Sequence, residues 1–249
     1  MKITKALLLS AAVFAAACSD DDDNNKKSNL ENAKISFGSQ NSVIEAPEGL
    51  QNSEDPQAQI ANSYVQLANG LTQYVGLMQA PQGAAKSKTR ITAANGRVKE
   101  TGDVLVYTWS DDQSGLSIGY QISETSDKYV FEIFMKETGS DWLKYFHAEE
   151  TKDGTAGLMK IYDIYGDNPS TVIFTYSWTR ANGELTLTFT DTEEESSVVI
   201  KVNETTGAGS VVSYDGAFKV YEMSWDAAGN GEWSYYEEGE VVDSGEWDA

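Results

Sequence analysis

The chain has 249 residues, of which 39 are acidic and 18 basic, giving a formal net charge of −21 and a pI near 4.2. Because such a charge repels phosphate backbones and anionic lipid, the composition argues against a nucleic-acid partner. A single cysteine and a single histidine exclude stabilising disulfides and any metal site that needs two or more imidazoles.

The first 17 residues have the layout of an export signal. Lys2 and Lys5 precede an apolar run, residues 6–17, which is too short to span a bilayer as a helix of about 20 residues. The run ends in three alanines, residues 15–17, directly before Cys18. The pattern therefore predicts a signal peptide over residues 1–17.

The segment Ala15-Ala16-Ala17-Cys18 resembles a bacterial lipobox, with Ala15 at the position where leucine is commonest. The resemblance implies that the Cys18 thiol receives a diacylglycerol, that the signal is removed, and that the new amine is acylated. The alternative is a secreted protein with a free thiol. As a lipoprotein, the mature chain is anchored to a membrane by its lipid without spanning it.

An acidic run follows the cysteine directly: Ser19, Asp20, Asp21, Asp22 and Asp23. By composition this run is a solvated spacer. It also resembles the acidic export signal that follows the lipidated cysteine in surface-exposed lipoproteins of Bacteroidota. That resemblance implies a location on the outer face of the outer membrane, with the periplasmic face as the alternative.

Residues 18–52 are rich in Asp, Asn, Ser, Glu and Gln, and we expect them to form an acidic flexible tether. A short isolated strand is predicted within it, at residues 33–37. A single domain is expected over residues 53–249, which is long enough to bury one apolar core without disulfides.

A helix is predicted over residues 56–78, because Asp55 can cap it and Pro56 suits the first helical position. Apolar residues recur every three or four positions, forming one stripe: Ile60, Tyr64, Leu67, Leu71, Val75 and Met78. We expect this stripe to cover one face of a sheet; the alternative is a surface helix that binds a partner. Residues 81–90, which carry most of the local positive charge, are expected to form a loop.

From about Val98 the pattern changes to short segments of β-rich or alternating residues separated by polar turns. Twelve strands are predicted: 104–109, 116–122, 128–135, 142–149, 156–163, 171–179, 184–190, 197–202, 210–214, 217–225, 232–236 and 241–247. Short turns such as Asp153-Gly154, Asn182-Gly183 and Asp215-Gly216 favour hairpins between antiparallel neighbours.

Mainly β structure is therefore expected, as a long antiparallel meander that forms a curved sheet, half-barrel or barrel, with the N-terminal helix packed on it. This architecture is similar to the curved, unclosed sheet with a helical lid of periplasmic lipoprotein carriers and related lipid-binding lipoproteins. The similarity concerns the architecture alone, and no residue motif accompanies it.

Residues able to carry chemistry are few. His147, predicted to share a strand face with Tyr145, has no accompanying Gly-x-Ser-x-Gly elbow, and no phosphate-binding loop is present. Residues 226–237 resemble an EF-hand loop in spacing, but Ala228 occupies a ligand position, so a glycine-containing hairpin is expected there. No catalytic residue, metal site or cofactor is therefore assigned.

Aromatic residues gather after residue 100, and the units Gly231-Glu232-Trp233 and Gly245-Glu246-Trp247 suggest two similar hairpin arms. Most aromatic rings are expected to fill a core, although exposed Trp and Tyr could stack on sugars. The pattern favours a non-catalytic binding module for an apolar ligand or glycan. The alternatives are a structural lipoprotein that contacts another envelope protein and, with less support, a carboxylate-based hydrolase.

Overall fold

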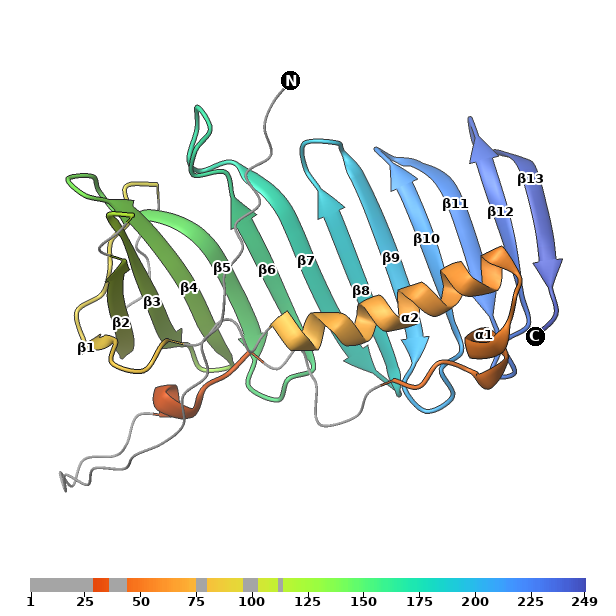
Figure 1. Ribbon diagram of the computed structural model, residues 1–249, viewed down its shortest axis with the longest axis horizontal. Coiled ribbons are helices and arrows are strands. Elements are labelled where there is room, and N and C mark those ends of the chain that lie inside the picture. The colour runs from red at the N-terminus through yellow and green to blue at the C-terminus, as the bar shows by residue number, and fades with distance from the viewer. Residues whose placement is uncertain (1–28, 36–43, 75–79, 96–102, 112–113) are drawn as a thin grey trace.

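A computed structural model describes residues 29–35, 44–74, 80–95, 103–111 and 114–249 (Figure 1). Its dominant feature is a single antiparallel sheet whose strands lie side by side in chain order from β1 to β13. The strands are β1 (Ala85–Ser87), β2 (Val104–Asp111), β3 (Leu116–Glu124), β4 (Lys128–Glu137), β5 (Leu143–Thr151), β6 (Ala156–Tyr162), β7 (Val172–Ala181), β8 (Glu184–Asp191), β9 (Ser196–Asn203), β10 (Gly209–Asp215), β11 (Phe218–Trp225), β12 (Gly231–Glu237) and β13 (Glu240–Trp247). The predicted fold class is confirmed in its open form, since β1 and β13 are the two edges of the sheet.

All twelve predicted strands are present as β2 to β13, each with its ends within two residues of the expected positions. The predicted turns also hold, because Asn182 and Gly183 both have positive φ (55° and 76°), which a tight hairpin turn requires. One strand was missed: β1 lies in the segment expected to be a loop.

In the described part of the chain, three helices precede the sheet: η1 (Asn29–Asn32), α1 (Glu48–Asn52) and α2 (Pro56–Tyr74). The predicted start of α2 is confirmed, because Asp55 Oδ1 accepts the backbone N–H groups of Gln57 at 2.7 Å and Ala58 at 3.3 Å. The expected continuation of the helix to residue 78 lies outside the described residues after Tyr74.

The segment before α2 packs on the sheet, unlike a free tether. Its apolar residues are buried in the same core as the sheet: Leu30, Ile35, Ile44, Ala46 and Leu50. The expected tether is therefore wrong for residues 29–35 and 44–52, and the domain begins before residue 53. Residues 33–35 also lack the predicted strand, while residues 36–37 lie outside the described part.

Helix α2 crosses one face of the sheet, here called the first face, and contacts β9, β10 and β11 (Figure 1). Of the predicted apolar stripe, Tyr64 packs partly against the core, but Ile60 and Leu67 do not lie on the buried side, and the side chains of Leu71, Val75 and Met78 lie outside the described part. Small residues face the sheet instead (Ala58, Ala61, Val65 and Ala68), while Ile60 and Leu67 remain 37% and 42% exposed. Short side chains let the helix axis approach the strands closely, which is why the helix is rotated away from its larger residues.

Tryptophans on the first face lie over glycines of neighbouring strands. Gly157 is paired with Trp178, and a Cβ added to this glycine would lie 1.9 Å from the indole. The two Gly-Glu-Trp units are indeed two arms of one hairpin, β12 and β13, in which Gly231 pairs with Trp247 and Trp233 with Gly245. The glycines leave room for the rings to lie flat on the sheet.

The last two hairpins repeat one structural unit. Trp225 Nε1 donates to the carbonyl of Gly207 at 2.7 Å, and 22 residues later Trp247 Nε1 donates to the carbonyl of Gly229 at 2.7 Å. Each unit also has a register shift at the equivalent point, after Ser213 and after Tyr235. This unit explains why the sheet continues regularly to its last strand.

Among the residues that the structure describes, the cover of the opposite, second face lies near the N-terminal end of the sheet. There, Ile91 and Ala93 form a small core with Val106 and Phe134. A Cβ added to Gly119 would lie 2.3 Å from Ile91, so the absence of a side chain admits this segment. None of the described helices is long and apolar enough to cross a membrane.

Candidate functional site

The residues on which the sequence-based localisation depends lie outside the described structure. These are Cys18 and the acidic run Ser19, Asp20, Asp21, Asp22 and Asp23. The lipid anchor and the export signal therefore stay predictions.

His147 lies on the second face and belongs to a network of charged side chains. Its Nδ1 is 3.5 Å from Glu132 Oε1 and its Nε2 is 3.1 Å from Glu149 Oε1. Tyr145 packs instead against the core of the first face, so the expected common face for these two residues is wrong. The cause is a register shift opposite Ile133 and Phe134, which interrupts the alternation of β5.

Glu132 is the centre of this network. It is buried, forms an ion pair with Lys144, and accepts a hydrogen bond from Gln121 Nε2 at 2.7 Å. Burial alone would raise the pKa of Glu132, but the hydrogen bond from His147 and the charge of Lys144 outweigh it and lower that pKa to about 2.

The network holds a loop and does not present a reactive group. Gln121 Oε1 accepts the backbone N–H of Ile91 at 2.8 Å, which ties the segment covering the second face to the charged side chains beneath it. Both ring nitrogens of His147 face carboxylates. This arrangement supports a structural role for His147, as the sequence indicated by default.

The stretch that resembles a calcium loop forms the turn between β11 and β12, as the expected glycine-containing hairpin. Asp226 Oδ1 accepts the N–H groups of Ala228, Gly229 and Asn230 at 2.8, 2.8 and 3.0 Å. Its carboxylate is thus occupied by the turn itself. Among the residues that the structure describes, no cluster of three or more His, Cys, Asp or Glu side chains is suited to a metal ion.

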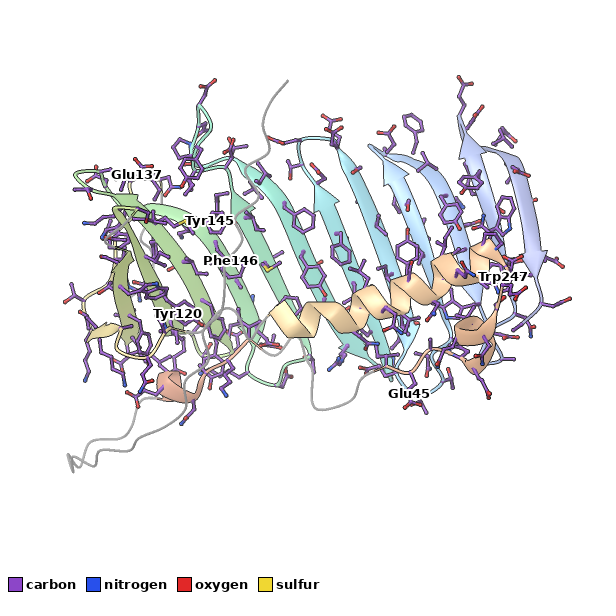
Figure 2. The ribbon with its side chains drawn as sticks, viewed as in Figure 1. Glu45, Tyr120, Glu137, Tyr145, Phe146 and Trp247 are labelled. Atoms are coloured by element: carbon purple, nitrogen blue, oxygen red, sulfur yellow. The ribbon has the colours of Figure 1, made fainter. Side chains whose placement is uncertain are left out.

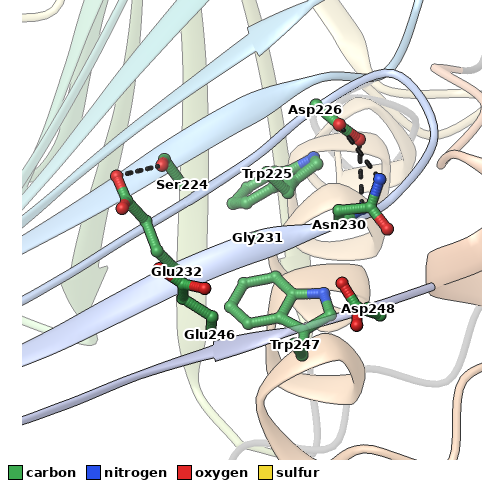
Figure 3. A pocket seen from close by; sticks show the side chains of 9 residues that line it. All are labelled: Ser224, Trp225, Asp226, Asn230, Gly231, Glu232, Glu246, Trp247 and Asp248. Atoms are coloured by element: carbon green, nitrogen blue, oxygen red, sulfur yellow. Dashed lines mark hydrogen bonds between the residues drawn. The ribbon is translucent and has the colours of Figure 1, made fainter.

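A pocket of about 400 Å³ lies next to this turn (Figure 3). Its lining includes two indoles and four carboxylates: Ser224, Trp225, Asp226, Asn230, Gly231, Glu232, Glu246, Trp247 and Asp248. Trp225 and Trp247 are each only 4% exposed, and each indole N–H already donates to a backbone carbonyl. Because stacking on a sugar requires a free ring face, the pocket offers little to a glycan.

A different part of the first face is incompletely covered, and we call it the open strip. It comprises partly buried apolar side chains that pack against the core: Ile133, Ile161, Phe174, Phe189 and Val198. Strand register places these side chains in one row from β4 to β9, in which the β5 position is occupied by Phe146, a core residue that is only 2% exposed. Ile133 pairs with Phe146, and Phe146 pairs with Ile161. Ile161 pairs in turn with Phe174, whose ring centroid lies 6.2 Å from that of Phe189. Phe189 pairs with Val198.

The large residues of α2 lie on the side of the helix toward this strip. The Tyr64 side chain lies beside Ser213, the cross-strand neighbour of Val198, and Gln57 Oε1 accepts the Tyr221 hydroxyl at 2.9 Å. Ile60 and Leu67 share the Tyr64 side of the helix, because residues three or four apart lie together. Asn69, on the other flank, exchanges two 2.8 Å hydrogen bonds with the backbone of Ile44. The N-terminal segment therefore lies along one flank of the helix, and the open strip lies along the other.

Figure 2 labels Tyr145 and Phe146 on β5, beyond the ribbon of α2; Tyr145 is partly buried, whereas Phe146 is fully buried in the core. Sequence reasoning missed the open strip, although it identified the alternation that creates an apolar face. The relevant signal was the mismatch in size: a helix of 19 residues cannot cover a face of thirteen strands.

No protein-family model matches the chain, and no curated protein matches its sequence significantly.

Proposed function

We propose that this protein is a non-catalytic binding protein of the cell envelope, anchored by a lipid on Cys18, which holds an apolar ligand with a long hydrocarbon chain along the open strip. The observation that carries the proposal is the row of apolar side chains from β4 to β9, partly buried on every strand except β5, where Phe146 is fully buried, with the exposed Ile60 and Leu67 on α2 nearby.

The dimensions of the strip suit an extended chain. Six neighbouring strands at about 4.8 Å spacing give a length of roughly 24 Å. Each methylene buried there contributes about 0.8 kcal/mol, so a long acyl group would be held firmly even without polar contacts. The chemistry of the floor, phenylalanine and branched aliphatic side chains, supports a hydrocarbon more than a sugar.

The most direct test is native mass spectrometry of the mature chain carrying Cys18→Ser, purified from its own host without detergent. We expect a stoichiometric added mass that organic solvent removes. A bare protein mass would contradict the proposal, provided that the protein was never exposed to detergent.

Two neighbouring valines provide a matched pair of variants for a binding test. Val198 faces the open strip and Val199, one residue later, faces the opposite side of the sheet. We expect Val198→Trp to fill the strip and weaken binding of a fluorescent long-chain fatty acid at least about tenfold, while Val199→Trp leaves binding unchanged. Equal binding by both variants, with unchanged unfolding curves, would contradict this location of the ligand.

Membrane anchoring has its own test. The Cys18→Ser variant should leave the membrane fraction, since the diacylglycerol on the thiol holds the mature chain there. Retention of the variant in the membrane fraction would contradict the lipobox. This result does not depend on whether the open strip binds a ligand.

A further inference from the structure

The two edges of the sheet carry opposite charge. The C-terminal hairpin and its preceding turn, residues 226–249, contain eight acidic residues and no Lys, Arg or His: Asp226, Glu232, Glu237, Glu238, Glu240, Asp243, Glu246 and Asp248. The segment around β1, residues 80–95, contains Lys86, Lys88 and Arg90 and no acidic residue. The acidic segment ends in one edge strand, and the basic segment contains the other.

Both edges also leave backbone groups available for pairing. β1 and β13 each have a single neighbour in the sheet, so one side of each strand is unpaired among the residues that the structure describes. The N–H of Ser244, in the middle of β13, donates to the side chain of Asp243 at 2.9 Å. This amide therefore already has an acceptor on its own strand, which an added strand would have to replace.

The two edges cannot satisfy each other within one molecule, because they lie at opposite ends of the open sheet (Figure 1). Between molecules, charge decides which edges can meet. Two β13 edges would place carboxylates opposite carboxylates, and two β1 edges would place ammonium groups opposite each other, both of which are unfavourable. Only β13 of one copy against β1 of another joins opposite charges.

We propose that this chain self-associates head to tail, with β13 of one copy adding to β1 of the next, so that the sheet continues from molecule to molecule. Such a contact is heterologous and leaves a free edge at each end, and it therefore builds an open array and not a closed dimer. The charges on the edges disfavour pairing between two like edges and favour pairing of β13 with β1.

The contact is weak for each pair of molecules. β1 has only three residues, and Lys86 already forms an exposed 3.3 Å ion pair with Glu31. Anchoring copies on one membrane surface raises their effective concentration, which favours an interface too weak to be stable in dilute solution.

Charge reversal tests the pairing on the full mature chain carrying Cys18→Ser. One variant reverses β13 (Glu240→Lys, Asp243→Lys, Glu246→Lys) and the other reverses β1 (Lys86→Glu, Lys88→Glu). We expect wild-type protein to show growing assemblies by sedimentation velocity as its concentration rises. Each variant alone should associate at least about tenfold more weakly, because its two edges now have the same sign.

Mixing the two variants is the decisive step, because each reversed edge then meets a complementary partner. The mixture should regain association toward the wild-type level. A matched control reverses three exposed glutamates on the turn between β8 and β9 (Glu193→Lys, Glu194→Lys, Glu195→Lys), which changes the net charge as much as the β13 variant and should leave association unchanged.

Wild-type protein that stays monomeric at every concentration, both in solution and when tethered to vesicles, would overturn the proposal. So would a mixture that associates no better than either variant alone. Equal loss of association in the turn variant would show that net charge, and not the edges, controls contact between copies, and would overturn it as well.

Discussion

The two ends of the sheet differ in how many of their faces are covered. In β2 to β5, both faces are covered: the first by the main core, and the second by the segment containing Ile91 and Ala93. In β8 to β13, α2 packs on the first face at β9, β10 and β11, and the second face carries Thr, Ser, Lys and Glu side chains that stay partly or fully exposed.

The sequences of the strands reflect this difference. β4 reads KYVFEIFMKE and buries neighbouring residues on both faces, Val130 with Phe131 and Glu132. β8 reads ELTLTFTD, in which the buried Leu185 and Leu187 alternate with polar residues. Strict alternation therefore marks the half of the sheet with one bare face, while its loss marks the half covered on both sides.

The largest effect is expected in the doubly covered end. Phe131 on β4 is fully buried, so Phe131→Ala should reduce the free energy of unfolding by about 3–5 kcal/mol through the cavity that it leaves. Chemical denaturation would measure this loss. The same substitution at Phe218, which is 67% exposed near the bare end, should cost no more than about 0.5 kcal/mol. Equal losses of unfolding free energy in the two variants would contradict the difference in burial between the two ends.

Low pH should destabilise the same end of the sheet. Glu132 has its pKa lowered to about 2 in the folded chain, so its contribution to stability is complete above its unfolded value of 4.5 and is lost as the pH falls from 4.5 toward 2. The loss is on the order of 3 kcal/mol. Denaturation at several pH values gives the free energy of unfolding as a function of pH, and this dependence should be weaker for Glu132→Gln than for the wild type. Some dependence should remain because the pKa of Glu149 is also lowered. An unchanged slope would contradict the charged network.

A smaller effect is expected at the repeated hairpins of the other end. A Cβ at Gly231 would lie 2.1 Å from the Trp247 ring, so Gly231→Ala should destabilise the chain by about 1–3 kcal/mol. Indole fluorescence during unfolding would follow the change. Ser234→Ala, in the same strand but on the bare face, is the control and should be close to neutral. A neutral Gly231→Ala would show that the ring is free to move.

The smallest effect concerns the helix that defines the open strip. Asp55→Ala removes the acceptor for the first N–H groups of α2 and should cost about 1 kcal/mol. Asp55→Asn keeps the cap and should cost less. Thermal unfolding would compare the two, and similar losses for both would argue that charge, and not the hydrogen bond, is the important property of this residue.

The twelve strands and their turns were predictable because antiparallel hairpins depend on local signals. Alternation sets the faces, and pairs such as Asn182-Gly183 reverse the chain without help from distant residues. The helix start followed from Asp55 and Pro56 for the same reason. The site was less accessible, since the open strip is defined by what fails to cover it, which depends on how α2 lies on a sheet formed later in the chain.

Four features were decided only by the tertiary structure. The rotation of α2 depends on close contact with the strands, which favours Ala58 and Ala61 over the larger Ile60. The buried segment before α2 has too few apolar residues for periodicity to detect, and it is ordered by the sheet it covers. Tyr145 and His147 lie on opposite faces because of a register shift at Tyr145, which composition does not reveal. The β1 strand is too short to predict and exists because β2 offers it an edge.

The sequence by itself therefore determined the class of fold, the order of the strands and which side of most strands is apolar, because these follow from contacts between neighbours in the chain. The tertiary structure decided where the apolar face stays open and that the basic and acidic edges lie at opposite ends of one sheet. Both depend on the relative placement of segments far apart in sequence, which local patterns do not encode.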